Sequence, residues 1–167
     1  PAFTRKVIAA LLQRPDVKVH LVPHVLSDSL PQDDDYRVAE ALKQEFPRVL
    51  LAERFAGPIE AKSYIAGLDM LVGGRMHACI AAHSSGVAVV PVAYSRKFAG
   101  LFQGLLGYDH LVPVSGLDTD DAVAFVLDAF ERRAELAQDC LRSRAKVDTL
   151  LSGYVAALAE LFARAAR

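Results

Sequence analysis

Short apolar segments that lack strict polar–apolar alternation recur along this chain, with helical patterns between them. The most continuous is Val87–Val92, and the others are Val17–Val22, Val49–Leu51, Asp69–Val72 and His110–Val114. Strands of this kind are buried on both faces, as in a parallel sheet that helices cover from both sides. The pattern therefore predicts an α/β fold built on a doubly wound parallel sheet.

Helical spacing of apolar residues, together with proline and glycine stops, predicts the intervening helices. They cover residues 3–12, 33–46, 58–66, 75–85 and 96–106, then one that starts at Thr119 and a last one with apolar residues from Leu136 to Phe162. A length of 167 residues fits a single domain over 1–167, with a helical tail over 118–167 packed on it. Such sheets ordinarily open with a strand, whereas this chain opens with a helix after Pro1. We therefore expect a piece of a longer protein whose first domain is missing; removal of an initiator methionine is the alternative explanation of Pro1.

Composition and charge exclude several classes of protein. Hydrophobic residues make up 53% of the chain and charged residues 23%, which excludes an intrinsically disordered chain. A net charge of -1 argues against a global electrostatic grip on nucleic acid or anionic membranes, although it is compatible with a local basic site. The longest stretch without a charged residue, Met76–Ser95, contains histidines, serines and a proline, so no transmembrane segment is expected. Cys79 and Cys140 lack metal or redox spacing and fit a reducing cytoplasm.

The turn after Asp69–Val72 carries the strongest candidate site. Gly73 and Gly74 stand between a predicted strand and a helix, so backbone N–H groups can approach an anion closely and the helix N-terminus adds partial positive charge. Arg75 supplies a planar donor fork for a carboxylate or phosphate, and His77 follows in the first helical turn. The alternative is a tight turn with a solvated arginine and a histidine bonded to the backbone.

Further polar residues follow the other predicted strands, and parallel sheets bind ligands at the carboxyl ends of their strands. Tyr94 and Lys97 come directly after the longest strand, where Lys97 and the arginine before it either clamp a phosphate or simply begin a helix. Glu60 stands in the first turn of a helix, where it either compensates the helix dipole or takes part in proton transfer. His24 and Asp28 follow the first strand and are weaker candidates for ligand contacts.

The sequence predicts neither a metal site nor a standard nucleotide-binding loop. His20 and His24 have no further ligand spaced to complete a tetrahedral site, and His83 faces away from His77 on the same helix. The chain contains no nucleophile elbow, no Walker lysine loop and no dinucleotide-binding glycine fingerprint. These absences argue against a serine hydrolase, a P-loop NTPase and an NAD enzyme.

In combination, these residues resemble the polysaccharide pyruvyl transferase family. The family typically shows a carboxylate-led helix, a strand ending in Asp-hydrophobic-Val-Gly, an Arg-hydrophobic-His-Ala turn and a Val-Pro strand followed by Tyr and Lys. The resemblance covers about Val19 to Lys97 and rests on Glu60, Lys62, Ile65, Leu68-Asp69, Val72-Gly73, Arg75-Met76-His77-Ala78, Val90-Pro91-Val92, Tyr94 and Lys97. The family is similar to two-domain glycosyltransferases of the B type (GT-B). The resemblance therefore implies a Rossmann-like domain that forms the C-terminal half of such an enzyme.

The resemblance also implies an activity. Phosphoenolpyruvate would be the donor substrate, no cofactor would be needed, and a pyruvate ketal would form across two hydroxyls of a sugar in a cell-surface polysaccharide. Under this interpretation His77 and Glu60 are catalytic, and the residues that bind substrate are Gly73, Gly74, Arg75, Lys97, Tyr94, His24 and Asp28.

The partners and the location follow from the same resemblance. The acceptor would be a glycan or a lipid-linked sugar, bound by the missing N-terminal domain. The enzyme would be cytoplasmic, at the inner face of the membrane through a lipid-linked acceptor. Isolated from its N-terminal domain, the chain is expected to fold but to be inactive.

Two other interpretations stay open from the sequence. In the first, the chain is one domain of a nucleotide-sugar glycosyltransferase, and Arg75 and Lys97 bind a diphosphate. Diphosphate binding does not require His77 in the anion-binding turn, which argues against this interpretation. A non-catalytic binding module would instead use the long amphipathic tail to pair with a partner helix.

Overall fold

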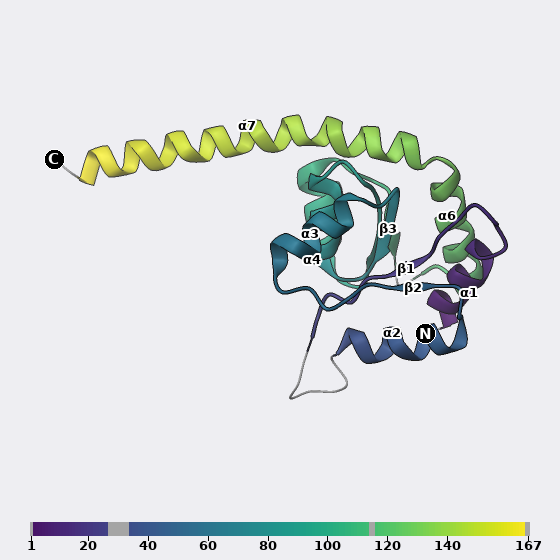
Figure 1. Cartoon of the computed structure of the whole chain (residues 1–167). Helices are drawn as coiled ribbons and strands as arrows, with labels where there is room; N and C mark the ends of the chain where they lie inside the picture. Colours follow the sequence, from purple (N-terminus) through teal and green to yellow (C-terminus); the bar gives the residue numbers. More distant parts are fainter. Residues whose placement is uncertain (1, 27–33, 114–115, 166–167) are drawn as a thin grey trace.

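The computed structural model describes residues 2–26, 34–113 and 116–165 and has a mixed α/β architecture (Figure 1). Its helices are α1 (Ala2–Leu11), α2 (Asp35–Glu45), α3 (Pro58–Ala66), α4 (Met76–Ser84), α5 (Arg96–Ala99), the π-helix η2 (Gly100–Leu106), α6 (Thr119–Glu131) and α7 (Arg133–Ala165). Its strands are β1 (His20–Leu21), β2 (Leu50–Leu51), β3 (Met70–Gly73), β4 (Ala88–Ala93) and β5 (Val112–Pro113). The predicted alternation of strands and helices is confirmed.

The described strands form two small parallel sheets, where we expected one. β1 pairs with β2, and β4 pairs with β3 on one side and β5 on the other. The expected strand Val17–Val22 forms only over His20–Leu21, and the expected strand His110–Val114 forms over Val112–Pro113, with Val114 outside the described residues. Strands of two residues offer few ladder hydrogen bonds, so a continuous doubly wound sheet is not confirmed.

Strand β4 is buried on both faces, as its sequence predicts. Val87, just before the strand, and Val89 pack into a cluster with α3, α4, η2 and α7, whereas Ala88 and Val90 pack against α1, α6 and β5. This opposite burial of successive residues follows from the period of two along a strand. In Figure 1, α3 and α4 accordingly lie on one side of the strands and α1 and α6 on the other.

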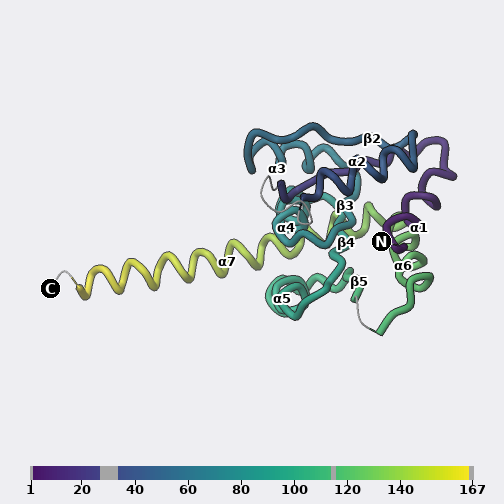
Figure 2. Tube along the Cα trace, turned by 90° about the horizontal axis from the view of Figure 1, so that it is seen from below, coloured from purple at the N-terminus to yellow at the C-terminus, as the bar shows by residue number. Residues whose placement is uncertain are grey.

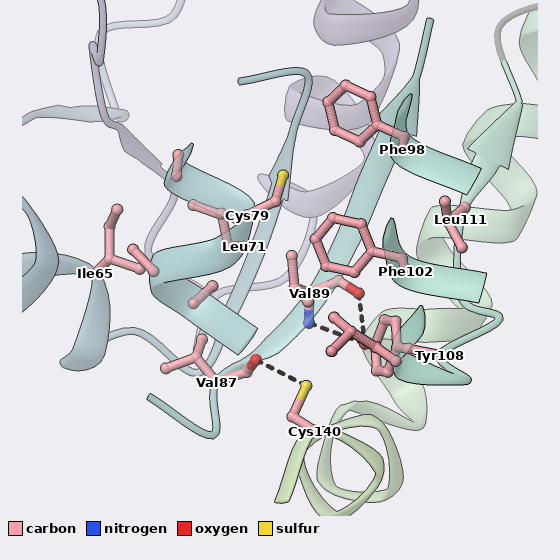
Figure 3. Packing of buried hydrophobic residues seen from close by; sticks show 14 residues of the cluster. Ile65, Leu71, Cys79, Val87, Val89, Phe98, Phe102, Tyr108, Leu111 and Cys140 are labelled. Atoms are coloured by element: carbon pink, nitrogen blue, oxygen red, sulfur yellow. Dashed lines mark hydrogen bonds between the residues drawn. The ribbon is translucent and has the colours of Figure 1, made fainter. Parts of the chain in front are cut away.

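The chain after β4 is held against the strand by a buried tyrosine. The expected helix over 96–106 forms as α5 followed by η2, which ends at Gly107 in a left-handed conformation with φ of 68°. The next residue, Tyr108, is 1% exposed and its Oη donates to the carbonyl of Val89 at 2.6 Å (Figure 3). Phe98 and Phe102, both fully buried, fill the space between η2 and β4 in the same view.

The last helix, α7, is one continuous helix of 33 residues, of which only the first part packs on the domain. Leu136, Cys140 and Ser143 are buried, and Cys140 donates to the carbonyl of Val87 at 3.4 Å (Figure 3). Beyond them α7 extends away from the body (Figures 1 and 2). Within the region expected to be a packed tail, α6 and the first part of α7 contact the rest of the domain. No helix within the described ranges is both long and apolar enough to cross a membrane.

His83 lies in the core between α4 and α7. It is 6% exposed, its Nε2 is 2.7 Å from Ser143 Oγ, and its ring meets those of Phe102 and Tyr108 edge-on. Burial lowers the pKa of this imidazole, so the folded protein holds it neutral.

Replacement of Tyr108 by phenylalanine is expected to destabilise the fold. The change removes the hydroxyl that donates to Val89 and leaves a buried carbonyl without that donor, so the free energy of unfolding should fall by about 1–3 kcal/mol. This decrease in the free energy of unfolding is measured by urea denaturation of the wild type and of Tyr108→Phe. Tyr154→Phe is the matched control, because Tyr154 is 62% exposed on α7 and its hydroxyl change should leave the midpoint in place. Equal denaturation midpoints for both variants would contradict a stabilising role of the Tyr108–Val89 hydrogen bond.

Stability is expected to fall as the pH drops below about 6.5, the ordinary pKa of histidine in an unfolded chain. The pKa of His83 is lowered in the folded state, so as the pH falls this imidazole is protonated in the unfolded chain first. Stability therefore continues to fall until the pH reaches the folded-state pKa of His83. Denaturation midpoints between pH 7 and pH 5 should fall less steeply for His83→Gln. Ser143→Ala, which removes the hydrogen bond but keeps the titrating ring, should retain the wild-type slope. His20, His24 and His110 shift in the same direction, so some slope should remain in His83→Gln.

Candidate functional site

The loop after β3 leads directly into the N-terminus of α4. Arg75 is the N-cap of α4, and its side chain makes no cap hydrogen bond there. Gly73 ends β3, and Gly74 lies beside the loop after β4, since a Cβ added to it would be 3.9 Å from Tyr94 Cδ1 and from the carbonyl of Val92. The first amides of α4 therefore lie at the carboxyl ends of β3 and β4, where the sequence predicted an anion-binding turn.

A carboxylate from α2 holds the Arg75 side chain. Nη2 of Arg75 donates to Oδ1 of Asp35 at 2.7 Å, and Nε donates to Oδ2 at 3.1 Å. Asp35 also accepts from the amides of His24 and Val25 at 3.2 and 2.9 Å. Burial alone would raise the pKa of Asp35, but the hydrogen bonds from Arg75, Val25 and His24 hold it below its ordinary value. The carboxylate is therefore charged at neutral pH.

His24 and His77 belong to the same cluster. Burial is the main cause that lowers the pKa of His24; His77 and Arg75 lower it further, while Asp35 acts in the opposite sense. The hydrogen bonds of Asp35 join the backbone of His24 to Arg75, and His77 lies two residues after Arg75 on the first turn of α4. The Nδ1 atom of His24 is buried and has no hydrogen-bond partner among the described residues. His77 is exposed on the first turn of α4.

The other predicted residues lie around this cluster or apart from it. Tyr94 is 63% exposed after β4 and stacks edge-on with Phe98. Lys97 is exposed on the first turn of α5. Glu60 is exposed, and its Oε2 accepts from the amide of Ala56 at 2.6 Å, so its observed contact is with the backbone that precedes α3. Asp28 lies outside the described residues.

A hollow of about 430 Å³ lies beside Tyr94 at the carboxyl ends of β4 and β5. Ser95, Arg96 and Gln103 give it polar atoms, and Leu111 and Pro113 give it apolar ones; of the two adjacent cations on α5, Arg96 is the one that lines it. A second hollow of about 520 Å³ lies at the amino ends of β3 and β4. Ligands of parallel sheets gather at the carboxyl ends, which favours the hollow beside Tyr94. Its lining includes Tyr94 and Arg96 but none of the four cluster residues.

Asp35 was not among the predicted site residues. Residues 33–35 were expected to begin a helix, and Asp34 does cap α2 by accepting from Tyr36 N at 2.9 Å. Asp35 has a different role, because its carboxylate turns back to the loop after β1 and to Arg75. A signal was present in the three consecutive carboxylates, which exceed what one helix N-terminus needs.

The cysteines and the remaining histidines do not extend the site. Burial raises the pKa of Cys79 to about 12 and that of Cys140 to about 11, so neither is a thiolate at neutral pH. The His20 ring is 2.6 Å from the hydroxyl of Tyr64 through Nδ1. Over residues 2–26, 34–113 and 116–165, no three His, Cys, Asp or Glu side chains cluster closely enough to hold a metal ion.

Comparison with known proteins identifies the family. The model of the polysaccharide pyruvyl transferase family matches residues 1–96, which is more than half of the 167 residues and includes the whole cluster of His24, Asp35, Arg75 and His77. Neither the curated proteins nor the solved structures include a significant match to the chain. The family's description names a transferase activity on polysaccharides. The chain belongs to the polysaccharide pyruvyl transferase family.

Proposed function

We propose that this chain binds phosphoenolpyruvate and transfers its pyruvyl group as a ketal to a sugar of a cell-surface polysaccharide. The observation that carries the proposal is the Arg75 guanidinium at the N-terminus of α4, joined through Asp35 to the loop of His24, with His77 on the first turn of the same helix. Phosphoenolpyruvate carries a phosphate and a carboxylate within a few ångströms, so its site needs two cationic or N–H-rich contacts. Arg75 with the first amides of α4 supplies one, and the cations of α5 supply the other.

The chemistry assigns a proton-transfer role to His77. An acid delivers a proton to the methylene carbon of phosphoenolpyruvate, so that C2 becomes oxocarbenium-like. One sugar hydroxyl then attacks C2 and loses its proton to a base. Inorganic phosphate leaves with the electron pair of the C2–O bond, which makes C2 oxocarbenium-like again. A second hydroxyl attacks C2 and closes the ketal ring, and its proton passes to the released phosphate. An imidazole titrates near neutral pH and serves as both acid and base, and positioned proton transfer contributes typically about 10²–10⁴-fold.

Glu60 has a lesser place in the proposal. The sequence assigned it to orienting His77 or accepting a hydroxyl proton, whereas its observed bond to the amide of Ala56 supports a helix-capping role in the ligand-free protein. Tyr94 and Lys97 flank the anion-binding turn on the β4 side and are proposed to contact the donor substrate. Asp28 is proposed to do so from the loop after β1.

We further propose that the chain is the Rossmann-like half of a GT-B-like enzyme, and that a second domain binds the acceptor. Two observations support this. Arg75 and His77 are exposed, although an oxocarbenium-like intermediate requires protection from water. The free half of α7 also carries a stripe of exposed apolar side chains: Leu150, Leu151, Tyr154, Val155, Leu161 and Phe162. A contiguous exposed apolar surface of this kind typically docks against another protein surface.

The remaining parts of the proposal follow from the reaction. No cofactor is required, because phosphoenolpyruvate itself is an activated donor. The acceptor is a glycan or a lipid-linked sugar, and the enzyme works in the cytoplasm, at the inner face of the membrane where a lipid-linked acceptor is held.

Ligand-induced thermal stabilisation is expected to distinguish phosphoenolpyruvate from nucleotides. At a concentration 100 times the dissociation constant, a ligand adds about 2.7 kcal/mol to the free energy of unfolding, which raises the melting temperature. Phosphoenolpyruvate should stabilise the wild-type chain, and Arg75→Lys, which keeps the charge but loses the fork, should bind it roughly tenfold more weakly. Stabilisation by UDP or GDP with no effect of phosphoenolpyruvate would support the glycosyltransferase interpretation instead.

Replacement of His77 by glutamine is expected to separate binding from chemistry. In the enzyme with its acceptor-binding domain, release of inorganic phosphate from phosphoenolpyruvate and acceptor should slow by about 10²–10⁴-fold while phosphoenolpyruvate still binds. His110→Gln is the control, because His110 bonds Asp139 on α7, outside the cluster. Wild-type turnover in His77→Gln would refute the acid/base role.

A further inference from the structure

One carboxylate links the two loops that form the candidate site. Asp35 is the first residue of α2, and its Oδ2 accepts from the amides of His24 and Val25, while its own amide donates to the carbonyl of Val25 at 2.9 Å. These bonds attach the loop after β1 to the start of α2. The same Oδ2 accepts from Nε of Arg75 in the loop after β3. The link therefore crosses from the two-stranded sheet to the three-stranded one.

The contact with Arg75 has a defined geometry. Nε is 3.1 Å from Oδ2, Nη2 is 2.7 Å from Oδ1, and a third distance, from Nε to Oδ1, is 3.3 Å. This is a side-on pairing along the Nε–Nη2 edge, which fixes the plane of the guanidinium more firmly than a single bond would. Asp35 is itself held by two backbone amides, so its carboxylate provides a fixed reference for that plane.

We propose that Asp35 is a positioning residue of the anion site, which orients the Arg75 guanidinium and the His24 backbone toward a shared ligand. The identity of that ligand as phosphoenolpyruvate rests on the function proposed above. Asp35 acts through Arg75 and need not touch the ligand. A guanidinium binds a carboxylate or phosphate through two parallel N–H groups, so its plane must face the anion. Without Asp35 to fix that plane, Arg75 keeps its charge but binds the anion more weakly.

The charge of Asp35 provides a second, ligand-independent signature. The groups that act electrostatically on the His24 imidazole are His77 and Arg75, which lower its pKa, and Asp35, which raises it. Removal of the Asp35 charge should therefore lower the pKa of His24 further. A merely structural role of Asp35 would leave this titration where it is once the variant is folded.

The test compares Asp35→Asn with a matched pair elsewhere on the surface. Glu45 pairs with Arg5, whose Nε lies 3.0 and 2.7 Å from its two oxygens. This ion pair joins α1 to the C-terminal end of α2, away from the cluster. The Arg5–Glu45 pair is exposed and contributes little stability, so Glu45→Gln should keep the melting temperature near the wild-type value. Asp35→Asn keeps an oxygen that can accept from the same backbone amides, so this variant should remain folded. Asp35→Asn alone should raise the phosphoenolpyruvate dissociation constant, measured by calorimetry, about tenfold.

A double substitution separates action through Arg75 from a direct effect. In an Arg75→Lys background, which lacks the fork, Asp35→Asn should cause little further loss of affinity, because coupled residues are not additive. A full additional tenfold loss would overturn the proposal, as would equal or tighter binding by the single variant, which would make Asp35 a competitor of the ligand. A melting temperature lowered well beyond that of Glu45→Gln, with an unchanged affinity, would also overturn it.

NMR titration of the His24 ring completes the test without a ligand. Its midpoint should move to lower pH in Asp35→Asn and stay in place in Glu45→Gln; no movement would overturn the electrostatic link.

If the wild-type protein binds inorganic phosphate but not phosphoenolpyruvate, the proposed function fails while Asp35 is still tested with phosphate as the probe. If the wild-type protein binds neither anion, the anion site and the role of Asp35 toward it are both refuted.

Discussion

Burial of β4 on both faces is the constraint on which the rest of the structure depends. Its side chains alternate between two apolar clusters, and Val89 and Val90, both fully buried, face opposite sides. A strand buried in this way requires helices on both sides, and the chain supplies α4 and η2 on one and α1 and α6 on the other. The loops at the carboxyl ends of β3 and β4 are therefore held beside each other by the best-packed part of the domain.

The site combines this rigid support with a network of charges. The guanidinium of Arg75, the carboxylate of Asp35 and the imidazoles of His24 and His77 interact where two short sheets meet the N-termini of α2 and α4. Asp35 balances part of the positive charge of Arg75, and the N-terminus of α4 and the cations of α5 add to the positive potential at the carboxyl ends of β3 and β4.

The helices and the turn between β3 and α4 could be predicted from the sequence because their signals are local. Pro58 and Gly67 flank α3 as proline and glycine stops predict, and Gly73, Gly74, Arg75 and His77 form one contiguous turn. Strand lengths were less predictable, since a ladder needs a partner: Val17–Val22 has strand composition, but only His20–Leu21 finds a neighbour in β2. Asp35 was missed because it lies 40 residues from Arg75 in the chain.

The amino-acid sequence by itself determined the class of fold, the order of its elements and the position of the turn between β3 and α4. These depend on hydrophobic periodicity and on backbone preferences that act over a few residues. Tertiary structure alone decided that the strands divide into two sheets, that Asp35 reaches Arg75, that Glu60 bonds the backbone before α3 and that half of α7 stands clear of the domain. Each of those outcomes depends on which distant groups meet, because a carboxylate has the same local preferences whether it caps a helix or holds an arginine.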